Sequence, residues 1–588
     1  MNLFGTKIAN LRTAAMLCAT AGLLTAAPNT SRDMPDRQSD QLTTVIVQYT
    51  QRPGNSDFAR AEKEGGQLRR TFPFMNAAVY KISAARAHKL SQDPNVRYIS
   101  PDRPVRGLLD YTAIATGAST FSSTWTGYGI GVAIIDSGVY GLHPDLLNGK
   151  LSRVVYEESF AQYTDDKPDT STKDKFGHGT HVAGIIGGSG ASSRGSRYSR
   201  TFTGVAPQSN IINLRVLDET GSGHDSGVIS AIDRAIQLKS KYNIRVLNLS
   251  LGRPIQESYK LDPLCQAVER AWRAGIVVVS AAGNQGRNNS FGTNGYGTVS
   301  SPGNHPLVIT VGAMKSMDTA VRGDDNIASY SSKGPTQVDH VVKPDIVAPG
   351  NRLVSLLDGS GKLVAIYPKS VLPLSYYTTT TKAGFSAEYI QLSGTSMATP
   401  VVSGAAALLL QADPSLSPDQ VKARLMRTAN KSFPASSMTW DLVTGQIYVS
   451  QYDLFTVGAG YLDIAAALSD TATLPAGRNA ASPIALRDPS RGRVTVVNDR
   501  SAVWGDSAVW GTTATWDSTA VWGNMAWVDG ASAVWGDSAV WGDSAVWGDS
   551  FTAGTSAVWG DSAVWGNLTM SGNSSVSEPI DILVKGEK

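Results

Sequence analysis

The 588-residue chain predicts an α/β protein in which a mostly parallel β-sheet is flanked by helices. A small α+β domain is expected before this sheet and a repetitive, β-rich tail after it. Apolar segments of strand length alternate with helical segments between residues 131 and 428, as a parallel sheet with helical crossovers requires. A shorter pattern of strands and helices occupies residues 43–101, and residues 501–566 return repeatedly to Ser-Ala-Val-Trp-Gly-Asp.

The composition is that of a globular protein. Hydrophobic residues make up 41% of the chain and charged residues 17%, and the formal net charge is +3. A charge this small on a chain of this length gives no reason to expect nucleic acid or an anionic membrane as a partner.

The first 27 residues are typical of a secretory signal peptide. Lys7 and Arg12 supply the positive n-region, residues 13–24 the apolar run, and Thr25-Ala26-Ala27 a small-residue cleavage site. The apolar run is too short to span a bilayer comfortably, and no other long apolar segment follows. We therefore expect no transmembrane segment and a secreted, extracellular mature protein.

Only two cysteines are present, and Cys18 would leave with the signal peptide. No disulfide framework then supports the fold, despite the oxidising destination. Cys265 is expected to be a buried structural thiol on a helix.

Residues 28–107, with a core at 43–101, form the small α+β domain. Strands are predicted at 44–49, 77–82 and 96–99, and helices at 57–64 and 84–92. The position between a signal peptide and a large domain favours a pro-segment. The alternative is a free-standing accessory domain.

The large domain spans residues 108–470 and alternates strands with helices. A helix at 418–428 carries an N-cap serine, a first-position proline and a capping glutamine in Ser417-Pro418-Asp419-Gln420. The other predicted elements are strands 131–135, 211–217, 246–249, 276–279, 307–311 and 345–347, and helices 226–238, 264–274 and 401–410.

Candidate catalytic residues stand at the ends of several of these elements. The strand at 131–135 is apolar throughout and ends in Asp136, where an open α/β sheet places its site. His178 opens a helix of small and aliphatic residues. Ser396 precedes a helix apolar on every side, where free backbone N–H groups favour negative charge. Pro400 is expected in or near the first turn, where a missing N–H costs least.

An acid, a histidine and a serine so placed are the parts of an acyl-transfer triad. His178 would take the serine proton, and Asp136 would fix the imidazole tautomer. Asn284, on a glycine-flanked turn, and the Ser396 backbone N–H would stabilise the oxyanion. The alternative for His178 and His181, three apart on one helix face, is a metal pair.

The segments GVAIIDSG, FGHGTHVAG, SAAGNQG and LSGTSMATP, in this order, resemble the subtilisin-like (subtilase) serine peptidase family. The resemblance implies a three-layer fold with a seven-stranded parallel sheet, and it carries over Asp136, His178, Asn284 and Ser396 as catalytic residues. It also implies that Ser250, Leu251 and Gly252 pair with substrate backbone. Ala281, Ala282 and Gly283 would wall the primary specificity pocket.

The resemblance implies further that residues 43–101 inhibit the enzyme until they are removed, with the cut near residues 105–109. No cofactor for catalysis is implied. Asp145 falls where some relatives hold a structural calcium, and the alternative is a solvated surface acid. Residues 355–390 are an insertion, in which Tyr376-Tyr377-Thr378-Thr379-Thr380-Thr381 suggests extra strands beside the active site.

The tail follows a proline-containing linker at 471–500 and spans residues 501–588. Ten of the thirteen tryptophans lie in it, with Trp504, Trp510, Trp516 and Trp522 six apart. An even spacing returns each residue type to one face of an extended chain. The alternatives are a stacked solenoid-like sheet, a flexible low-complexity tail, and a ribbon presenting tryptophans to a glycan or cell-surface ligand.

These observations predict a secreted serine endopeptidase made as a zymogen, acting on protein or peptide substrates. A rival hypothesis is a surface-binding protein whose repeats act and whose peptidase fold is inactive. A third is a processing enzyme with few substrates. The small residues of the pocket wall favour apolar over basic side chains on the acyl side of the cut bond.

Overall fold

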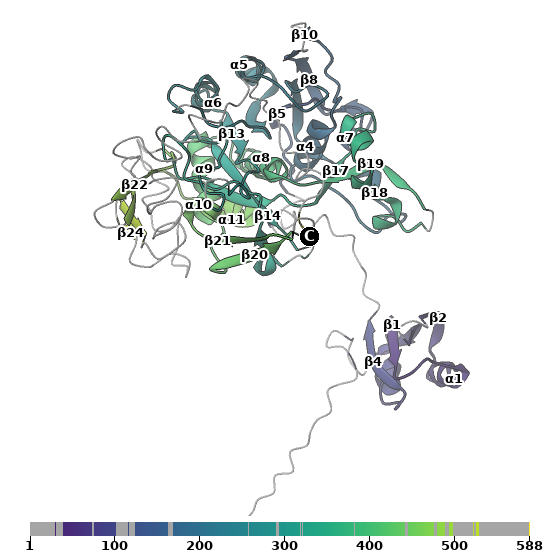
Figure 1. Cartoon of the computed structure of the whole chain (residues 1–588). Helices are drawn as coiled ribbons and strands as arrows, with labels where there is room; N and C mark the ends of the chain where they lie inside the picture. The colour runs from purple at the N-terminus through teal and green to yellow at the C-terminus, as the bar shows by residue number, and fades with distance from the viewer. Residues whose placement is uncertain are drawn as a thin grey trace, which may run out of the picture. The chain divides into compact units, whose positions relative to one another are not determined.

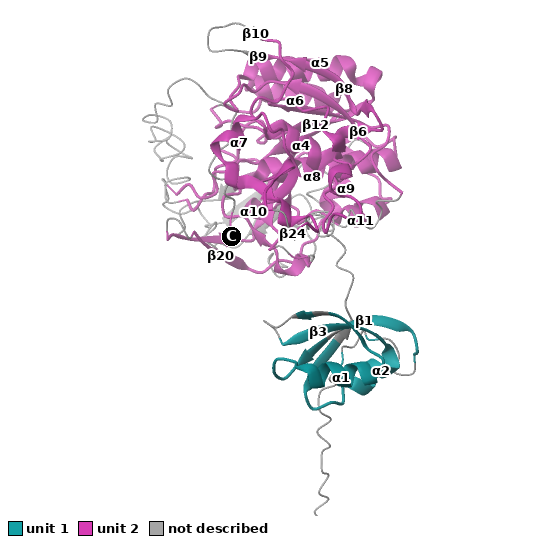
Figure 2. Ribbon diagram, turned by 90° about the vertical axis from the view of Figure 1, so that its right-hand side faces the viewer, with its two compact units in different colours: residues 1–105 teal, residues 106–588 magenta. Residues whose placement is uncertain are grey.

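The computed structural model describes the larger part of the chain as two compact units, residues 1–105 and 106–588 (Figure 2). The described residues are 30, 34, 39–72, 76–101, 116, 124–162, 168–256, 258–289, 293–317, 319, 321–380, 383–441, 445–474, 479–488, 493–497, 521–522, 525–528 and 587. The signal peptide, the expected cut at 105–109 and nearly all of the repeat region lie outside them.

The first unit is a four-stranded antiparallel sheet in the order β2-β3-β1-β4 with two helices. Its buried residues include Val45, Val47, Tyr80 and Ile82. The sequence prediction missed β2, whose polar residues give little strand signal and which, among the described strands, pairs with β3 alone. The elements are β1 Leu42–Tyr49, α1 Asn55–Lys63, β2 Gln67–Phe72, β3 Ala77–Ser83, α2 Ala84–Leu90 and β4 Val96–Pro101.

The second unit is built on one large sheet, and the described part of it has eight strands in the order β15-β14-β13-β12-β5-β11-β8, with β16 also on β14. Seven strands run parallel, and β15 alone is antiparallel. The strands are β5 Gly131–Asp136, β8 Val154–Ser159, β11 Asn210–Arg215, β12 Ile244–Leu249, β13 Val277–Ala281, β14 Ile309–Lys315, β15 Asn326–Ile327 and β16 Ile346–Pro349.

Helices cover this sheet and complete the three layers of the predicted α/β fold (Figure 1). Helices α4 and α8 pack together against the central strands, and α5 and α6 form another helical layer on the sheet. Helix α8 is apolar because it is a core helix. It is the one described helix long and apolar enough to cross a membrane, and 89% of that window is buried.

Helix α9 begins where the sequence predicts a cap. The Ser417 hydroxyl accepts from Gln420 N, and the Gln420 side chain accepts from Ser417 N at 2.8 Å. The helices are α4 His178–Gly187, α5 Asp225–Tyr242, α6 Pro263–Arg273, α7 Lys362–Ile366, α8 Thr395–Ala412, α9 Pro418–Thr428, α10 Leu454–Val457 and α11 Ile464–Ser469, with short 3-10 turns at Pro144–Leu146, Ala191–Ser193, Arg322–Asp324, Pro368–Ser370 and Leu374–Tyr376.

The insertion at 355–390 adds strands, but not where the sequence suggests them. Together with β17 Leu353–Leu356, the strands β18 Val371–Pro373 and β19 Phe385–Leu392 form a three-stranded antiparallel sheet. The prediction of a strand at Tyr376-Tyr377-Thr378-Thr379-Thr380 is wrong. Tyr376 and Tyr377 instead pack against Phe202, with ring centroids 6.4 and 5.6 Å away, so aromatic packing overrides the strand propensity.

Residues 471–500, expected to be a linker, contain ordered structure. Ala480, Ser482 and Ala485 are buried, and Ala485 N donates to His340 O at 2.9 Å. These contacts hold the segment against the second unit. A four-stranded sheet follows, made of β22 Ile484–Asp488, β23 Arg493–Val497, β25 Met525–Val528 and β24 Val521–Trp522.

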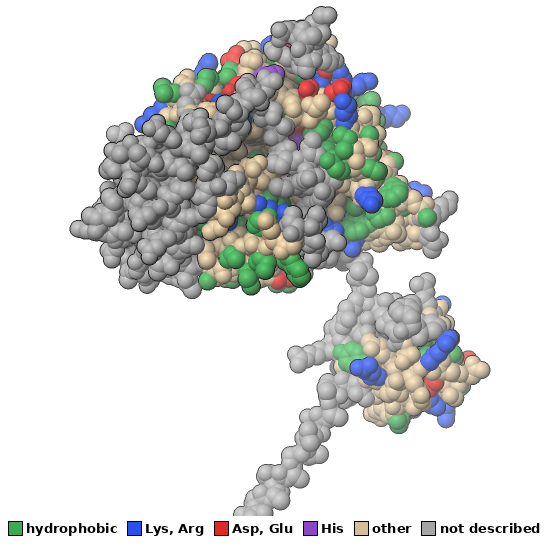
Figure 3. All heavy atoms as spheres, in the orientation of Figure 1, with side chains coloured by type: hydrophobic (Ala, Val, Ile, Leu, Met, Phe, Trp, Pro, Cys, Tyr) green, Lys and Arg blue, Asp and Glu red, His purple; other side chains and the backbone are tan. Residues whose placement is uncertain are grey.

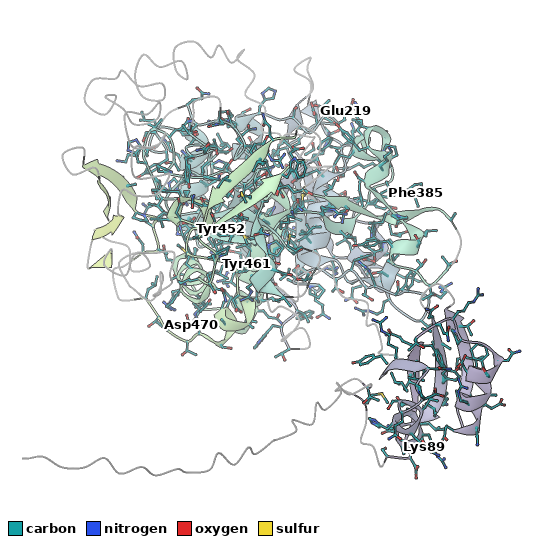
Figure 4. The ribbon with its side chains drawn as sticks, turned by 60° about the horizontal axis from the view of Figure 1, so that its bottom comes forward. Lys89, Glu219, Phe385, Tyr452, Tyr461 and Asp470 are labelled. Carbon is teal, nitrogen blue, oxygen red and sulfur yellow. The ribbon has the colours of Figure 1, made fainter. Side chains whose placement is uncertain are left out.

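Shorter hairpins and buried hydroxyls complete the second unit. Tyr452 and Tyr461 are both 1% exposed (Figure 4). The Tyr452 hydroxyl donates to Asn326 Oδ1 at 3.2 Å, and the Tyr461 hydroxyl donates to Asp325 Oδ2 at 2.6 Å. Hydrophobic side chains gather over the hairpin of β20 Ser436–Trp440 and β21 Ile447–Gln451, at the lower edge of the unit in Figure 3. The other hairpins are β6 Leu147–Asn148 with β7 Leu151–Ser152 and β9 Ala161–Gln162 with β10 Pro168–Asp169.

Candidate active site

Asp136 and His178 meet at the carboxyl end of β5. Asp136 is its last residue, and His178 is the first residue of α4. His178 Nδ1 lies 2.7 Å from Asp136 Oδ1, and both side chains are buried. Gly179 permits this approach, because a Cβ there would come within 2.2 Å of Gly138 O and 3.1 Å of Asp136 Cβ. Any side chain at 179 would push the helix off the strand.

Asp174 caps the helix that carries His178. Its carboxylate accepts from Gly177 N at 2.7 Å and Thr180 N at 2.8 Å, and also from the Ser137 hydroxyl at 2.8 Å. Burial raises the pKa of Asp174. The sequence analysis overlooked this residue, although an aspartate placed before the first turn of a helix is a recognisable cap signal.

Ser396 is the second residue of α8 and is fully buried in this structure. Its hydroxyl donates to Ser250 O at 2.8 Å, while the Ser250 hydroxyl donates to Ser396 O at 2.9 Å. Pro400 lies inside the helix rather than in its first turn. Because Pro400 has no N–H, it leaves Ser396 O without its helical donor, and the Ser250 hydroxyl replaces that bond.

Asn284 follows β13 and lies against the start of α8. Its Oδ1 accepts from Thr395 N at 2.9 Å and from Thr395 Oγ1 at 3.2 Å. A backbone N–H can only donate, so this contact fixes which amide atom is oxygen. Asn284 Nδ2 is buried and has no hydrogen-bond partner among the described residues. It is therefore an available donor next to the serine.

The two segments predicted to bind substrate lie on either side of Ser300. A Cβ at Gly252 would come within 2.9 Å of the Ser300 Cβ, and one at Gly283 within 2.5 Å of its hydroxyl. Neighbouring Ser250, Leu251, Ala281 and Ala282 are buried. Ser300 thus lies between the segment expected to pair with substrate backbone and the expected pocket wall, a position that only the fold reveals.

His181 is not arranged as a metal ligand. It is fully buried, and its Nε2 lies 3.1 Å from Leu353 O. Burial, with repulsion from His178, lowers the pKa of His181 to about 3, so it is a neutral core histidine. No group of three or more His, Cys, Asp and Glu side chains placed for a metal ion occurs in the described part of the chain.

Asp145 is fully buried, so its prediction as a solvated surface acid is wrong. Its carboxylate accepts from Ser192 N at 2.7 Å and the Tyr389 hydroxyl at 2.8 Å. The Arg153 guanidinium donates to Asp145 O at 2.8 Å, to Ser209 O at 2.9 Å and to Gly187 O. A calcium ion needs six to eight oxygen ligands. Here the oxygens already face protein donors and a resident cation, so these residues do not fit calcium.

Cys265 is fully buried, as predicted for a structural thiol. Its Sγ lies 3.1 Å from Asn304 Oδ1. Burial raises the pKa of the thiol. It is therefore held in its protonated, unreactive form.

Comparison with known proteins finds a matching family model and related serine proteases. A family model described as the subtilase family matches residues 127–450. The serine protease AprX of Bacillus subtilis (strain 168) is 36% identical over 408 residues, covering 67% of this chain and 84% of the relative. Subtilisin E of the same strain is 33% identical over 374 residues, covering 62% and 79%. An extracellular serine proteinase of Thermus sp. (strain Rt41A) is 33% identical over 349 residues, covering 58% and 67%.

Proposed function

The chain belongs to the subtilase family and is a serine-type peptidase, and from that premise we propose that it is a secreted endopeptidase made as a zymogen. Its substrates are proteins. Its catalytic residues, in this proposal, are Asp136, His178, Ser396 and Asn284. The observation that carries it is the 2.7 Å contact of His178 with Asp136 at the end of β5. Ser396 is hydrogen-bonded to Ser250, which follows the neighbouring parallel strand β12.

Catalysis begins when the Ser396 hydroxyl turns from the Ser250 carbonyl to His178 Nε2. His178 takes the proton as the serine oxygen bonds to the substrate carbonyl carbon. Asp136 accepts from Nδ1–H, which fixes the tautomer and stabilises the imidazolium. His178 then gives the proton to the leaving amine, the C–N bond breaks, and water hydrolyses the acyl-enzyme by the same steps in reverse.

The tetrahedral oxyanion is stabilised by two donors. Asn284 Nδ2 is one, since Thr395 already binds the other end of the amide. The Ser396 backbone N–H, at the positive end of α8, is the second. Subtilases need no cofactor for this chemistry, and the proposal does not include calcium, one of the two alternatives for Asp145.

Maturation and location complete the proposal. Residues 28–107 act as an intramolecular inhibitor that is cut off near residues 105–109, and residues 1–27 direct export. The Thermus relative is named an extracellular serine proteinase, which supports the same destination here. Ser250–Gly252 and Ala281–Gly283 hold the substrate, with apolar side chains preferred on the acyl side. The tail holds the enzyme to a cell-surface or glycan ligand.

The test compares the wild type with Ser396→Ala, expressed identically. The proposal expects wild type to lose residues up to about 107 by mass spectrometry and to digest casein, while Ser396→Ala does neither. If both proteins mature but neither digests casein, the binding-protein hypothesis replaces this one. Equal casein digestion by both would show that Ser396 is not the nucleophile. A peptide library with a strict Arg or Lys preference would contradict the apolar pocket.

A further inference from the structure

Glu587 lies far beyond the catalytic residues in the sequence, yet it is buried in the second unit. Its side chain is 1% exposed. Glu587 Oε1 accepts from Arg287 Nη2 at 2.9 Å, from Ser329 N at 2.8 Å and from the Ser329 hydroxyl. A carboxylate removed from water this completely is costly unless several donors replace the water. Here three donors converge on Oε1, whereas the buried Oε2 has no hydrogen-bond partner among the described residues.

The main chain of Glu587 is recognised as well. Asn351 Nδ2 donates to Glu587 O at 2.8 Å, and Glu587 N donates to Asn351 Oδ1 at 2.7 Å. One side-chain amide thus satisfies both backbone groups of a single residue, as it would for a bound peptide. Arg287 and Ser329 therefore bind the glutamate side chain, and Asn351 binds its backbone. These three residues are called the Glu587 pocket.

Arg287 is itself held in place for this contact. Its Nη1 lies 2.9 Å from Asp441 Oδ2, its Nε donates to the Ser329 hydroxyl at 2.7 Å, and its guanidinium lies 4.8 Å from the Tyr448 ring centroid. With its rotamer fixed by these partners, the guanidinium loses little conformational entropy when a carboxylate binds.

The pocket borders the proposed catalytic machinery. Arg287 lies three residues after Asn284 on the same loop, whose Gly286 N donates to Tyr330 O at 2.8 Å. On the other side, Asn351 follows Gly350, whose carbonyl accepts from Gly394 N at 2.8 Å, just before the helix of Ser396. A residue bound here contacts the loop that carries Asn284 directly, through Arg287, and it contacts Asn351, whose neighbour Gly350 is bonded to Gly394.

We propose that Arg287, Ser329 and Asn351 form a peptide-binding site for a glutamyl residue, and that its occupant is Glu587 of the same chain. The site fastens the segment that follows the tryptophan repeats next to the loop of Asn284. Because the contacts involve neither Asp136 nor His178, the proposal does not depend on peptidase activity.

The test uses the full chain with Ser396→Ala, so that it stays intact. Glu587→Gln keeps the size of the side chain and its main-chain contacts with Asn351 but removes the charge facing Arg287. Glu578→Gln removes one carboxylate from the same segment and serves as the matched control. We expect Glu587→Gln to lower the melting temperature and speed protease cleavage of the segment severalfold, and Glu578→Gln to leave both at the parent values.

A binding measurement tests occupancy directly. A fluorescein-labelled peptide copying residues 583–588 is titrated onto the Ser396→Ala parent, onto Glu587→Ala, and onto Glu587→Ala with Asn351→Ala. The proposal expects binding to Glu587→Ala, with affinity at least tenfold weaker for the parent and for the double variant. Equal binding to the parent and Glu587→Ala, no binding to any form, or equal behaviour of Glu587→Gln and Glu578→Gln would overturn it.

Discussion

Replacing Arg153 with methionine tests whether a side chain fills the place at which the family resemblance offered calcium as one of two alternatives. The change removes three hydrogen bonds from a charged donor to the buried carbonyls of Asp145, Gly187 and Ser209. Bonds to charged groups contribute roughly 1.5–3 kcal/mol each. The site relaxes partly after the change, so the net loss in the free energy of unfolding is smaller than the sum of the three bonds. We take about 4 kcal/mol, which is within the range measured when one partner of a buried charged pair is removed.

The expected change in melting temperature follows from this free-energy loss and the size of the domain. Unfolding entropy of about 2.1 cal/mol/K per residue over roughly 350 residues gives about 0.7 kcal/mol/K, so Arg153→Met should lower the melting temperature by about 5 °C. The matched control is Arg245→Met. Arg245 also donates to two carbonyls, Pro414 O and Leu416 O, both at 3.0 Å, but it is only partly buried, so its loss should be about 1 kcal/mol.

The assay is scanning calorimetry in the Ser396→Ala background, with excess calcium and with a calcium chelator. Arg153→Met should melt lower than the parent by the same amount in both buffers. The reasoning fails if calcium restores the stability of Arg153→Met, or if the chelator lowers the melting temperature of the parent but not of Asp145→Asn. Either result would mean that the site binds the metal after all.

Three further predictions concern the proposed site and its surroundings. Asn284→Ala should lower kcat about 10²–10³-fold with KM nearly unchanged, the effect that loss of one oxyanion donor has in subtilisin; a normal kcat in steady-state assays would remove Asn284 from the oxyanion hole. Ser300→Asp should raise kcat/KM for substrates with Arg or Lys on the acyl side at least tenfold relative to substrates with Phe or Leu there. About 1.4 kcal/mol of attraction between the new carboxylate and the substrate cation is enough for this change. An unchanged ratio of the kcat/KM values would place Ser300 outside the pocket. Burial raises the pKa of Asp325 from 3.8 to about 7, so between these pH values the folded state keeps a proton that the unfolded state has lost. Stability from this group therefore falls as pH rises from about 4 to 7, by at most about 4 kcal/mol, and Asp325→Asn should remove that slope from denaturant titrations; a parallel slope in both proteins would contradict it.

Much of the fold follows from local patterns, and the reason is physical. The strand before Asp136 is buried on both faces, so an uninterrupted apolar run marks it in the sequence. Helix α9 carries its own cap within four residues. Asp136, His178 and Ser396 each stand at the end of such an element, where a short segment of sequence contains both the residue and the element that holds it.

The remaining features depend on contacts between distant segments, which no local pattern contains. Ser300 lies between Gly252 and Gly283 only because β12 and β13 are neighbours. Arg153 meets the carbonyls of Gly187 and Ser209 from more than thirty residues away in the sequence. Tyr376 and Tyr377 have strand propensity, and packing against Phe202 overrides it.

The buried position of Glu587 also changes the topology of the repeat region. Strand β22 is attached to the second unit where Ile484 pairs with Val341, and Glu587 is attached through Arg287 and Asn351. The chain between these two attachments is therefore tied at both ends. Closing a loop costs only roughly 0.6 kcal/mol more for each doubling of its length. Hexapeptide units can therefore be gained or lost with little effect on the attachment, and a single cut between residues 529 and 586 leaves both pieces bound to the enzyme.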